Sequence, residues 1–312
     1  ALGAGNTVIY KPASATPLTA SLLVEVFQEA GLPAGCLNLI YGAGRTVGRF
    51  LTAGERIRMF SFTGSVPVGK ALHEAVGFRR ISLELGSNSA NIVHEDVADV
   101  AWAAEHCARH AFVNAGQVCI SCQRVYVSRS IYEAFCAAMT ETARSFRSGD
   151  LMDVHTQIGP MISEREAQRI EAWVDEAEDE GARVLTGGNR RGAFYEPTVL
   201  TDVTPAMKVV TEETFAPVVS IIPYDTIEEA VAAVNASRYG LQAGVFTRSL
   251  AVANYCAEHL EVGGVIIGDG ATFRMDNMPY GGVKESGIGK EGPAYAIREL
   301  TEEKLIVLNV EG

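Results

Sequence analysis

Cys119 is the residue of this sequence whose setting most favours covalent chemistry. It follows Asn114-Ala115-Gly116-Gln117, a turn-forming segment placed directly after a long helical pattern. A polar, flexible backbone of this kind can present a thiol to a cleft and direct N–H groups at a bound oxygen. Most single cysteines are small buried hydrophobes, and that alternative stays open for Cys119.

Cys122 lies three residues further on and makes a C-x-x-C pair with Cys119. A zinc site would need a second pair of ligands, and no other Cys or His pair has suitable spacing, so we expect no metal. A thioredoxin-like redox pair is one alternative, and an incidental neighbour is favoured over it. The six cysteines are scattered rather than arrayed as a disulfide framework, which indicates a reducing, cytoplasmic location.

Glu84 is the second residue with catalytic potential, within Ser82-Leu83-Glu84-Leu85-Gly86. A carboxylate at the end of an apolar strand is costly to bury unless it is paired or functional. Desolvation would raise its pKa and suit it to work as a general base. The alternative is a Glu at a strand end that faces solvent.

The elements that must position these residues alternate between strand-like and helix-like patterns, which predicts βαβ units and a parallel sheet. The expected strands are residues 7–10, 37–41, 57–62, 81–85, 90–94, 124–127 and 305–310, with further strands between 218 and 267. The expected helices are residues 18–30, 66–75, 97–113, 131–146 and 164–180. In the helix over 18–30, Leu18, Leu22 and Val26 recur at helical spacing.

Composition narrows the possible functions. The 312 residues are enough for two domains with substantial cores. No stretch reaches the roughly 18 apolar residues that a membrane span requires. The net charge of −12, without a basic run, argues against a nucleic-acid partner. The chain begins without an initiator Met or a signal pattern and reads like the middle of a protein, so we expect it to be N-terminally incomplete.

Two short segments together carry a specific resemblance. The aldehyde dehydrogenase superfamily has a pair of active-site signatures, and two segments resemble them: Leu83-Glu84-Leu85-Gly86 and Gly116-Gln117-Val118-Cys119. The spacing of 35 residues from Glu84 to Cys119 also resembles that of the family. Segments 11–17, 62–65, 212–217 and 279–287 resemble further signatures of the family in the same order. Segments 86–89 and 274–280 are most similar to its lactaldehyde-dehydrogenase-like branch.

The resemblance implies that Cys119 attacks an aldehyde and that Glu84 activates the water that hydrolyses the resulting thioester. It implies NAD or NADP as cofactor, and one oxyanion donor from the Cys119 N–H. The second donor of the family, an Asn side chain, is expected before the start of this chain. Two alternatives remain: a CoA-acylating semialdehyde dehydrogenase, which Glu84 disfavours, and an inactive fragment that serves as an assembly scaffold.

The resemblance also assigns cofactor contacts, at Lys11, Ser14, Gly64, Ser65, Leu85, Glu213 and Phe215. Ser65 is expected to cap a helix whose N–H groups hold the pyrophosphate, although the same pattern is an ordinary N-cap. Ser14 stands where NAD-preferring members carry Glu, so we expect NADP to be accepted. The alternatives are a surface lysine at 11, a turn residue at 14, a surface acid at 213 and a core aromatic at 215.

Five residues are expected near the aldehyde: Val113, Val118, Ile120, Arg274 and Tyr280. Arg274 can pair with an anionic or hydroxylated head group of a short aldehyde, or instead with Asp276. Val113 and Val118 are apolar where relatives that use semialdehydes or phosphorylated aldehydes carry Arg. Tyr280 is expected to add an aromatic wall or simply to pack.

The expected architecture is an aldehyde-dehydrogenase-like α/β fold with a Rossmann-type cofactor domain. We expect the C-terminal part of this domain over residues 1–86, a catalytic α/β domain over 87–284, and a return to the cofactor domain over 285–312. The strand at 305–310 resembles the family's terminal strand, which adds to a neighbouring subunit. A homodimer or homotetramer is therefore expected.

Overall fold

The computed structural model describes residues 1–310, which divide into two compact units. Unit 1 comprises residues 1–83, 275–280 and, within the described part, 288–310. Unit 2 comprises residues 84–274 and 281–287. Each unit is described by itself.

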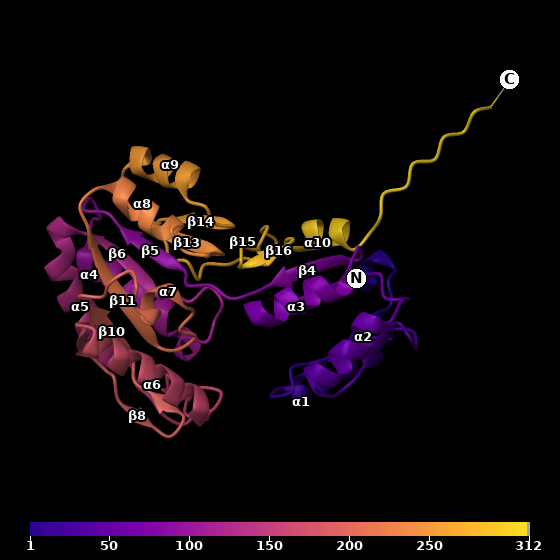
Figure 1. The fold of residues 1–312 in the computed structure, drawn as a ribbon, viewed down its shortest axis with the longest axis horizontal. Helices are drawn as coiled ribbons and strands as arrows, with labels where there is room; N and C mark the ends of the chain where they lie inside the picture. The colour runs from indigo at the N-terminus through magenta and orange to yellow at the C-terminus, as the bar shows by residue number, and fades with distance from the viewer. Residues whose placement is uncertain (311–312) are drawn as a thin grey trace. The chain divides into compact units, whose positions relative to one another are not determined.

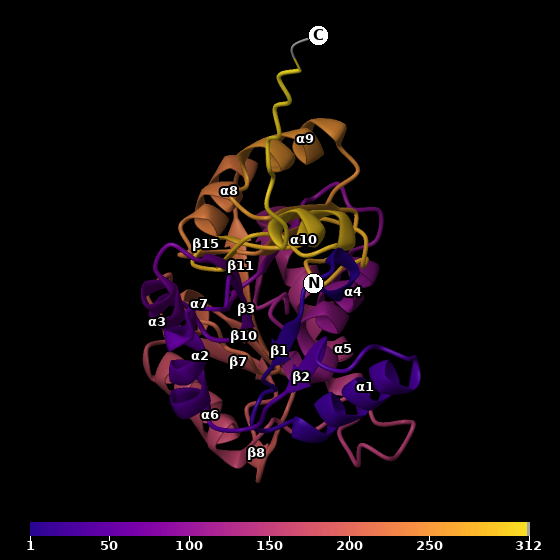
Figure 2. The ribbon, with the colours of Figure 1, turned by 90° about the vertical axis from the view of Figure 1, so that its right-hand side faces the viewer.

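Unit 1 contains two small sheets and the helices beside them. Strands β1 (Val8–Tyr10) and β2 (Leu37–Leu39) pair in parallel next to α1 (Pro17–Glu29), as Figure 2 shows. A second sheet has the order β16-β4-β3, with β3 (Met59–Thr63), β4 (Arg80–Glu84) and β16 (Gly287–Ile288). Its remaining helices are η1 (Leu2–Ala4), η2 (Gly44–Gly48), α2 (Arg49–Ala53), α3 (Val66–Val76) and α10 (Pro293–Glu299).

Helix α1 confirms the predicted helix, but the face that was read from its spacing is not a core face. Leu18, Leu22 and Val26 are exposed, whereas Ala20 and Val24 are buried. The helix contacts β2, and its larger apolar side chains Leu18, Leu22, Leu23 and Val26 are exposed in the described chain.

Unit 2 is built on one seven-stranded sheet in the order β14-β13-β5-β6-β11-β10-β7 (Figure 1). The strands are β5 (Ala90–Val93), β6 (Arg124–Ser128), β7 (Arg183–Thr186), β10 (Thr198–Thr201), β11 (Val218–Tyr224), β13 (Gln242–Phe246) and β14 (Gly264–Ile267). All neighbours pair in parallel except β7, which lies antiparallel at the edge. The predicted parallel sheet is therefore correct, and its antiparallel edge was not predicted.

Helices cover both faces of this sheet, as a parallel sheet requires. They are α4 (Val100–Phe112), α5 (Tyr132–Ser145), α6 (Glu164–Asp179), α7 (Lys208–Thr211), α8 (Ile227–Asn235) and α9 (Leu250–His259). Alternate strand residues serve the two faces: Val125 and Val127 pack with α4 and α5, whereas Tyr126 packs with α8 and α9. Short elements complete the unit: η3 (Val113–Gly116), η4 (Arg129–Ile131), β8 (Arg190–Arg191), β9 (Phe194–Tyr195), β12 (Tyr239–Gly240) and β15 (Val283–Lys284).

Helix α4 begins three residues later than the sequence predicted. The Asp99 carboxylate accepts hydrogen bonds from Ala101 N at 2.8 Å and Trp102 N at 3.1 Å, so Asp99 is the N-cap. A side-chain oxygen that satisfies the first free N–H groups fixes where a helix starts.

The prediction of a strand over 305–310 is wrong for the single chain. These residues form neither helix nor strand and are exposed, because a strand requires a partner and the described chain supplies none there. The single chain does not test the predicted dimer or tetramer. In residues 1–310, no helix is long and apolar enough to cross a membrane.

Candidate active site

Cys119 follows a left-handed turn at the end of α4. Asn114, Ala115 and Gly116 have φ of 53°, 54° and 68°, a conformation that costs energy for any residue except glycine. Gly116 also packs directly on the Ala216 carbonyl, where a Cβ would overlap the oxygen. The turn thus requires glycine at 116, and it leaves Cys119 partly exposed.

The loop after Cys119 is tied to the end of α4. Ser121 Oγ donates to the Ala111 carbonyl at 3.0 Å, and Cys122 N donates to the His110 carbonyl at 3.1 Å. The last carbonyls of a helix have no partner within the helix, so these bonds satisfy them. The helix end therefore fixes the chain directly after Cys119.

Cys122, the second cysteine of the C-x-x-C pair, is a free cysteine in the structure. Its side chain is fully buried, and burial, with Cys107 beside it, raises the pKa of the Cys122 thiol well above its ordinary value. A buried thiol that stays protonated is a poor nucleophile. The structure shows no disulfide between Cys119 and Cys122, and the incidental neighbour remains the favoured interpretation.

Glu84 ends β4 and is buried, with 6% of its surface exposed, so the alternative of a solvent-facing Glu is wrong. The connector after it is fixed by Ser286. Leu85 N donates to the Ser286 carbonyl at 2.9 Å, and Ser286 Oγ donates to the Gly86 carbonyl at 2.8 Å. Leu85 itself is buried.

Gln123 joins three segments of unit 2 that are distant in sequence. Its backbone N donates to the Ser89 carbonyl at 3.0 Å, and its Nε2 donates to the Ser87 carbonyl at 3.0 Å. Its Oε1 accepts from Thr214 N at 2.8 Å. The Glu84 connector, the Cys119 loop and the segment of Glu213 and Phe215 are therefore held side by side by one buried side chain.

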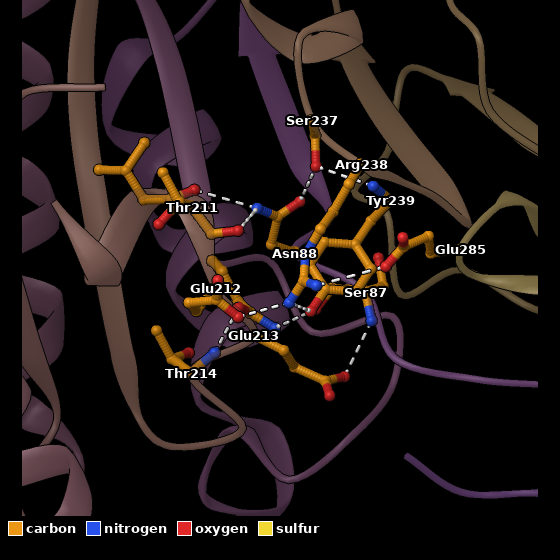
Figure 3. A network of polar contacts seen from close by, with 12 residues as sticks. Ser87, Asn88, Thr211, Glu212, Glu213, Thr214, Ser237, Arg238, Tyr239 and Glu285 are labelled. Carbon is orange, nitrogen blue, oxygen red and sulfur yellow. Dashed lines mark hydrogen bonds and ion pairs between the residues drawn. The ribbon is translucent and has the colours of Figure 1, made fainter. Parts of the chain in front are cut away.

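Glu213 is held against the Glu84 connector. Its Oε1 accepts from Ser87 N at 2.9 Å, and a Cβ on Gly86 would lie 2.5 Å from its Oε2 (Figure 3). Burial raises the pKa of the Glu213 carboxyl, while the Ser87 N–H and the charges of Arg169 and Arg238 act in the opposite direction. Glu213 is thus a positioned carboxylate and not an ordinary surface acid. Phe215, with φ 45° and 38% exposed, is not a core aromatic.

Arg238 links the Glu213 segment to the glycine-rich segment near the C-terminus (Figure 3). Its Nη2 donates to Glu212 at 2.5 Å and to the Tyr239 hydroxyl at 2.7 Å, and its Nη1 donates to Glu285 at 3.3 Å. Beside it, Ser237 Oγ donates to Asn88 Oδ1 at 2.7 Å, and Asn88 Nδ2 donates to the Val210 carbonyl at 3.0 Å.

Four of these segments lead into strands of the seven-stranded sheet. Residues 84–89 precede β5, residues 119–123 precede β6, residues 212–217 precede β11, and residues 237–241 precede β13. These strands are parallel, so the side chains gather at their amino ends. The usual position for ligands in open α/β sheets is the carboxyl end.

The predicted substrate residues differ in accessibility. Val113 and Arg274 are exposed and Val118 is partly exposed, whereas Ile120 is buried. Tyr280 belongs to unit 1, where it is buried and its backbone pairs with Glu291, which favours the packing alternative. In the described residues, no cluster of three His, Cys, Asp or Glu side chains could hold a metal.

The predicted cofactor residues of unit 1 lie on separate turns. Lys11 Nζ donates to the Pro12 carbonyl at 2.5 Å, and Ser14 is exposed. Ser65 occupies the N-cap position of α3 but forms no side-chain cap bond, which corrects the prediction that it caps the helix. Pro67, at the second position of the helix, lacks one of the two N–H groups that an N-cap side chain can accept from.

Gly64 precedes this turn, and a Cβ there would overlap the Phe62 ring. Because the Ser65 side chain forms no cap bond, it does not accept a hydrogen bond from the N–H groups in the first turn of α3. Such a helix start suits an anion.

Sequence reasoning missed Gln123, Arg238, Ser87 and Ser286. Each acts through a contact with a segment far away in the chain, and no local spacing marks such a partner. One sequence signal could have helped. Some of these polar residues lie just before apolar strands, and a polar group next to a buried strand must find a hydrogen-bond partner.

Comparisons with known proteins cover almost the whole chain. A family model described as "Aldehyde dehydrogenase family" matches residues 1–306. The chain is 52% identical over 310 residues to 3-sulfolactaldehyde dehydrogenase of Priestia aryabhattai, covering 99% of this chain and 65% of that protein. It is 40% identical over 314 residues to lactaldehyde dehydrogenase of Methanococcus maripaludis, covering 99% of this chain and 67% of that protein.

Solved structures show the same fold. Aldehyde dehydrogenase 21 of Physcomitrella patens, in complex with the reaction product succinate, matches with a TM-score of 0.94 and 39% identity over 97% of this chain and 63% of that one. Glyceraldehyde-3-phosphate dehydrogenase of Methanocaldococcus jannaschii, complexed with NADP, matches with a TM-score of 0.91 and 39% identity over 95% and 65%. The chain spans about 65% of the length of its first curated relatives.

Proposed function

We propose, from the premise that this chain belongs to the aldehyde dehydrogenase family, that it oxidises a short hydroxylated or anionic aldehyde to the carboxylic acid with NAD(P)⁺. The family and the α/β fold are as the sequence predicted. The observation that carries the proposal is the junction at Gln123, which brings the segments of Cys119, Glu84 and Glu213 together in unit 2.

In the proposed reaction, the Cys119 thiolate forms a C–S bond to the aldehyde carbon, and the carbonyl oxygen takes the negative charge. The N–H of Cys119 donates to that oxygen. A bound nicotinamide ring supplies the acceptor for the hydride that leaves this carbon, which leaves a thioester on Cys119. The left-handed turn at 114–116 keeps the thiol at a fixed place throughout.

Glu84 then acts on water. Its carboxylate takes a proton from a water molecule while the water oxygen attacks the thioester carbonyl. The C–S bond breaks, the acid is released, and Cys119 is again a thiolate. Burial of Glu84 supports this role, because a desolvated carboxylate is a stronger base than an exposed one.

The described residues fit a nicotinamide cofactor at two places. In unit 2, the Glu213 carboxylate is fixed by Ser87 N and can accept hydrogen bonds from ribose hydroxyls, with Phe215 next to it. In unit 1, the first turn of α3 after Gly64 and Ser65 can hold a phosphate. Ser14 adds no carboxylate that would repel a 2′-phosphate, and we propose that NADP is accepted. We also propose the domain division expected from the sequence: part of the cofactor domain over residues 1–86, a catalytic domain over 87–284, and a return to the cofactor domain over 285–312.

The substrate class rests on the relatives and on Arg274. The names of two relatives specify a sulfonated and a hydroxylated three-carbon aldehyde. Arg274 is exposed at the end of the loop after β14 and can pair with such a head group.

The test is to mix the protein with NAD⁺ or NADP⁺ and a panel of 3-sulfolactaldehyde, lactaldehyde and propionaldehyde, with and without CoA, and to follow the absorbance of the reduced cofactor. We expect reduction without CoA, fastest with the sulfonated or hydroxylated aldehydes. Mass spectrometry of Glu84→Gln should show the acyl group on Cys119, and Cys119→Ala is the matched control. A requirement for CoA, or the absence of both cofactor reduction and acyl adduct, would overturn the proposal.

A further inference from the structure

His110, in the last turn of α4, is a partly buried titratable residue that the proposed reaction does not use. Its side chain is 14% exposed. Its Nε2 lies 2.9 Å from Asp269 Oδ1, and its Nδ1 contacts the Thr272 hydroxyl. Both partners belong to the loop of residues 268–274, which ends in Arg274.

The partners define the protonation of the ring. Burial lowers the pKa of His110 below its ordinary value, although Asp269 acts in the opposite direction, so the ring is neutral near pH 7. The Asp269 carboxylate only accepts, so Nε2 carries the proton and donates to it. Nδ1 is then the acceptor for the Thr272 O–H, and the ring fixes two residues of the loop at once.

Loop 268–274 is also held by buried amides on the neighbouring strands. Asn91 Oδ1 accepts from Ala271 N at 2.9 Å. Gln242 Nε2 donates to the carbonyls of Ala271 at 2.7 Å and Phe273 at 3.1 Å. Gly270 lies against the His110 ring, where a Cβ would be 2.5 Å from Cγ. The loop is thus a fixed element, docked on the end of α4.

The same turn of α4 also binds the segment that follows Cys119. The carbonyl of His110 accepts from Cys122 N, and the carbonyl of Ala111 accepts from Ser121 Oγ. The left-handed turn that leads to Cys119 begins within four residues of His110. One residue therefore contacts the Cys119 loop through its backbone and the Arg274 loop through its side chain.

We propose that His110 is a positioning residue that holds loop 268–274 in register with Cys119 and thereby sets a preference for anionic over uncharged electrophiles. The inference rests on the proposed function for the roles of Cys119 and Arg274. Arg274 supplies the positive charge, and His110 and Thr272 keep the backbone that carries it in place.

The experiment compares the alkylation of Cys119 by iodoacetate, which is anionic, and by iodoacetamide, which is neutral. Rates are measured on the full chain, without cofactor, by mass spectrometry of the Cys119 peptide. The ratio of the two rates reports the charge preference at the thiol and cancels changes in thiol reactivity. Arg274→Met gives the ratio without the guanidinium.

Thr272→Val removes one hydrogen bond at constant size and leaves the His110–Asp269 contact in place. We expect it to lower the iodoacetate-to-iodoacetamide ratio about 3- to 10-fold, towards the Arg274→Met value, as the loss of one neutral hydrogen bond allows. Thr272→Ser should restore the ratio, because it keeps the hydroxyl. His110→Gln should lower the ratio similarly, and His259→Gln, in the last turn of α9 with a local bond to the Tyr255 carbonyl, should not.

Two results would overturn the inference. One is a ratio that stays unchanged in Thr272→Val and His110→Gln while Arg274→Met lowers it. The other is an Arg274→Met protein with the wild-type ratio, since the loop would then carry no charge preference. The two alkylation rates are measured without turnover. Failure of the proposed oxidation would be seen separately, as the absence of reduced cofactor with the wild-type protein.

Discussion

Replacing Gln123 with Leu should destabilise unit 2 far more than removing one exposed amide side chain would. The change keeps the approximate size but leaves the Ser87 carbonyl and the Thr214 N–H without their partner. Both residues are 1% exposed, so water cannot take the place of the amide. Each unsatisfied buried group costs about 1–3 kcal/mol, which gives a loss of about 2–6 kcal/mol in the free energy of unfolding. A domain has only about 5–15 kcal/mol in total.

The assay is urea unfolding followed by tryptophan fluorescence. The chain has two tryptophans, Trp102 and Trp173, and both lie in helices of unit 2, so the signal reports that unit. The matched control is Gln157→Leu: Gln157 also accepts a backbone N–H, from Arg147 at 3.0 Å, but it is exposed. The control should lose less than about 1 kcal/mol. A loss in Gln123→Leu no larger than in the control would refute the idea that Gln123 holds the three segments together.

Three further predictions concern the chemistry. Glu84→Gln should lower steady-state turnover about 10²–10⁴-fold but keep a single burst of reduced cofactor, and loss of the burst would argue against a role confined to hydrolysis. Cys122→Ala should change kcat less than about threefold, because the raised pKa of this buried thiol keeps it protonated, and loss of activity comparable to that of Cys119→Ala would contradict this. Acidification should raise the KM for the cofactor by up to about tenfold per pH unit, beginning above the ordinary carboxyl range. Burial raises the pKa of Glu213, so its carboxylate is lost at a higher pH than usual, and Glu213→Gln should show a high KM without this acid limb.

The sequence predicted most of the fold because each element carries its own local signal. Apolar runs between turn residues located β5, β6 and β11, and helical spacing located α1 and α5. Two of the failures arose where a boundary or an element depends on a hydrogen-bond partner that the local sequence pattern does not identify. The start of α4 depends on which oxygen accepts the first N–H groups, and Asp99 does so. The strand over 305–310 depends on a partner that the described chain lacks.

The candidate site was predictable only where the family signatures fall. Cys119, Glu84 and Glu213 belong to recognisable segments, whereas Gln123 and Arg238 are ordinary polar residues until the fold brings their partners near. A turn at 114–117, directly after a long helix, was anticipated, but not its left-handed conformation. Its requirement for glycine at 116 follows from the carbonyl of Ala216, which lies 100 residues away in the chain.

The position of the site at the amino ends of parallel strands has a consequence for how stability and activity are related. Just before these strands, side-chain oxygens accept hydrogen bonds from three of the backbone N–H groups. Glu213 accepts from Ser87, Gln123 from Thr214, and Ser286 from Gly240. These side chains cap the sheet in the way that N-cap residues cap helices. A substitution made here to alter recognition therefore also uncaps a strand, so selection for a new substrate in this unit has to tolerate a loss of stability or compensate for it elsewhere.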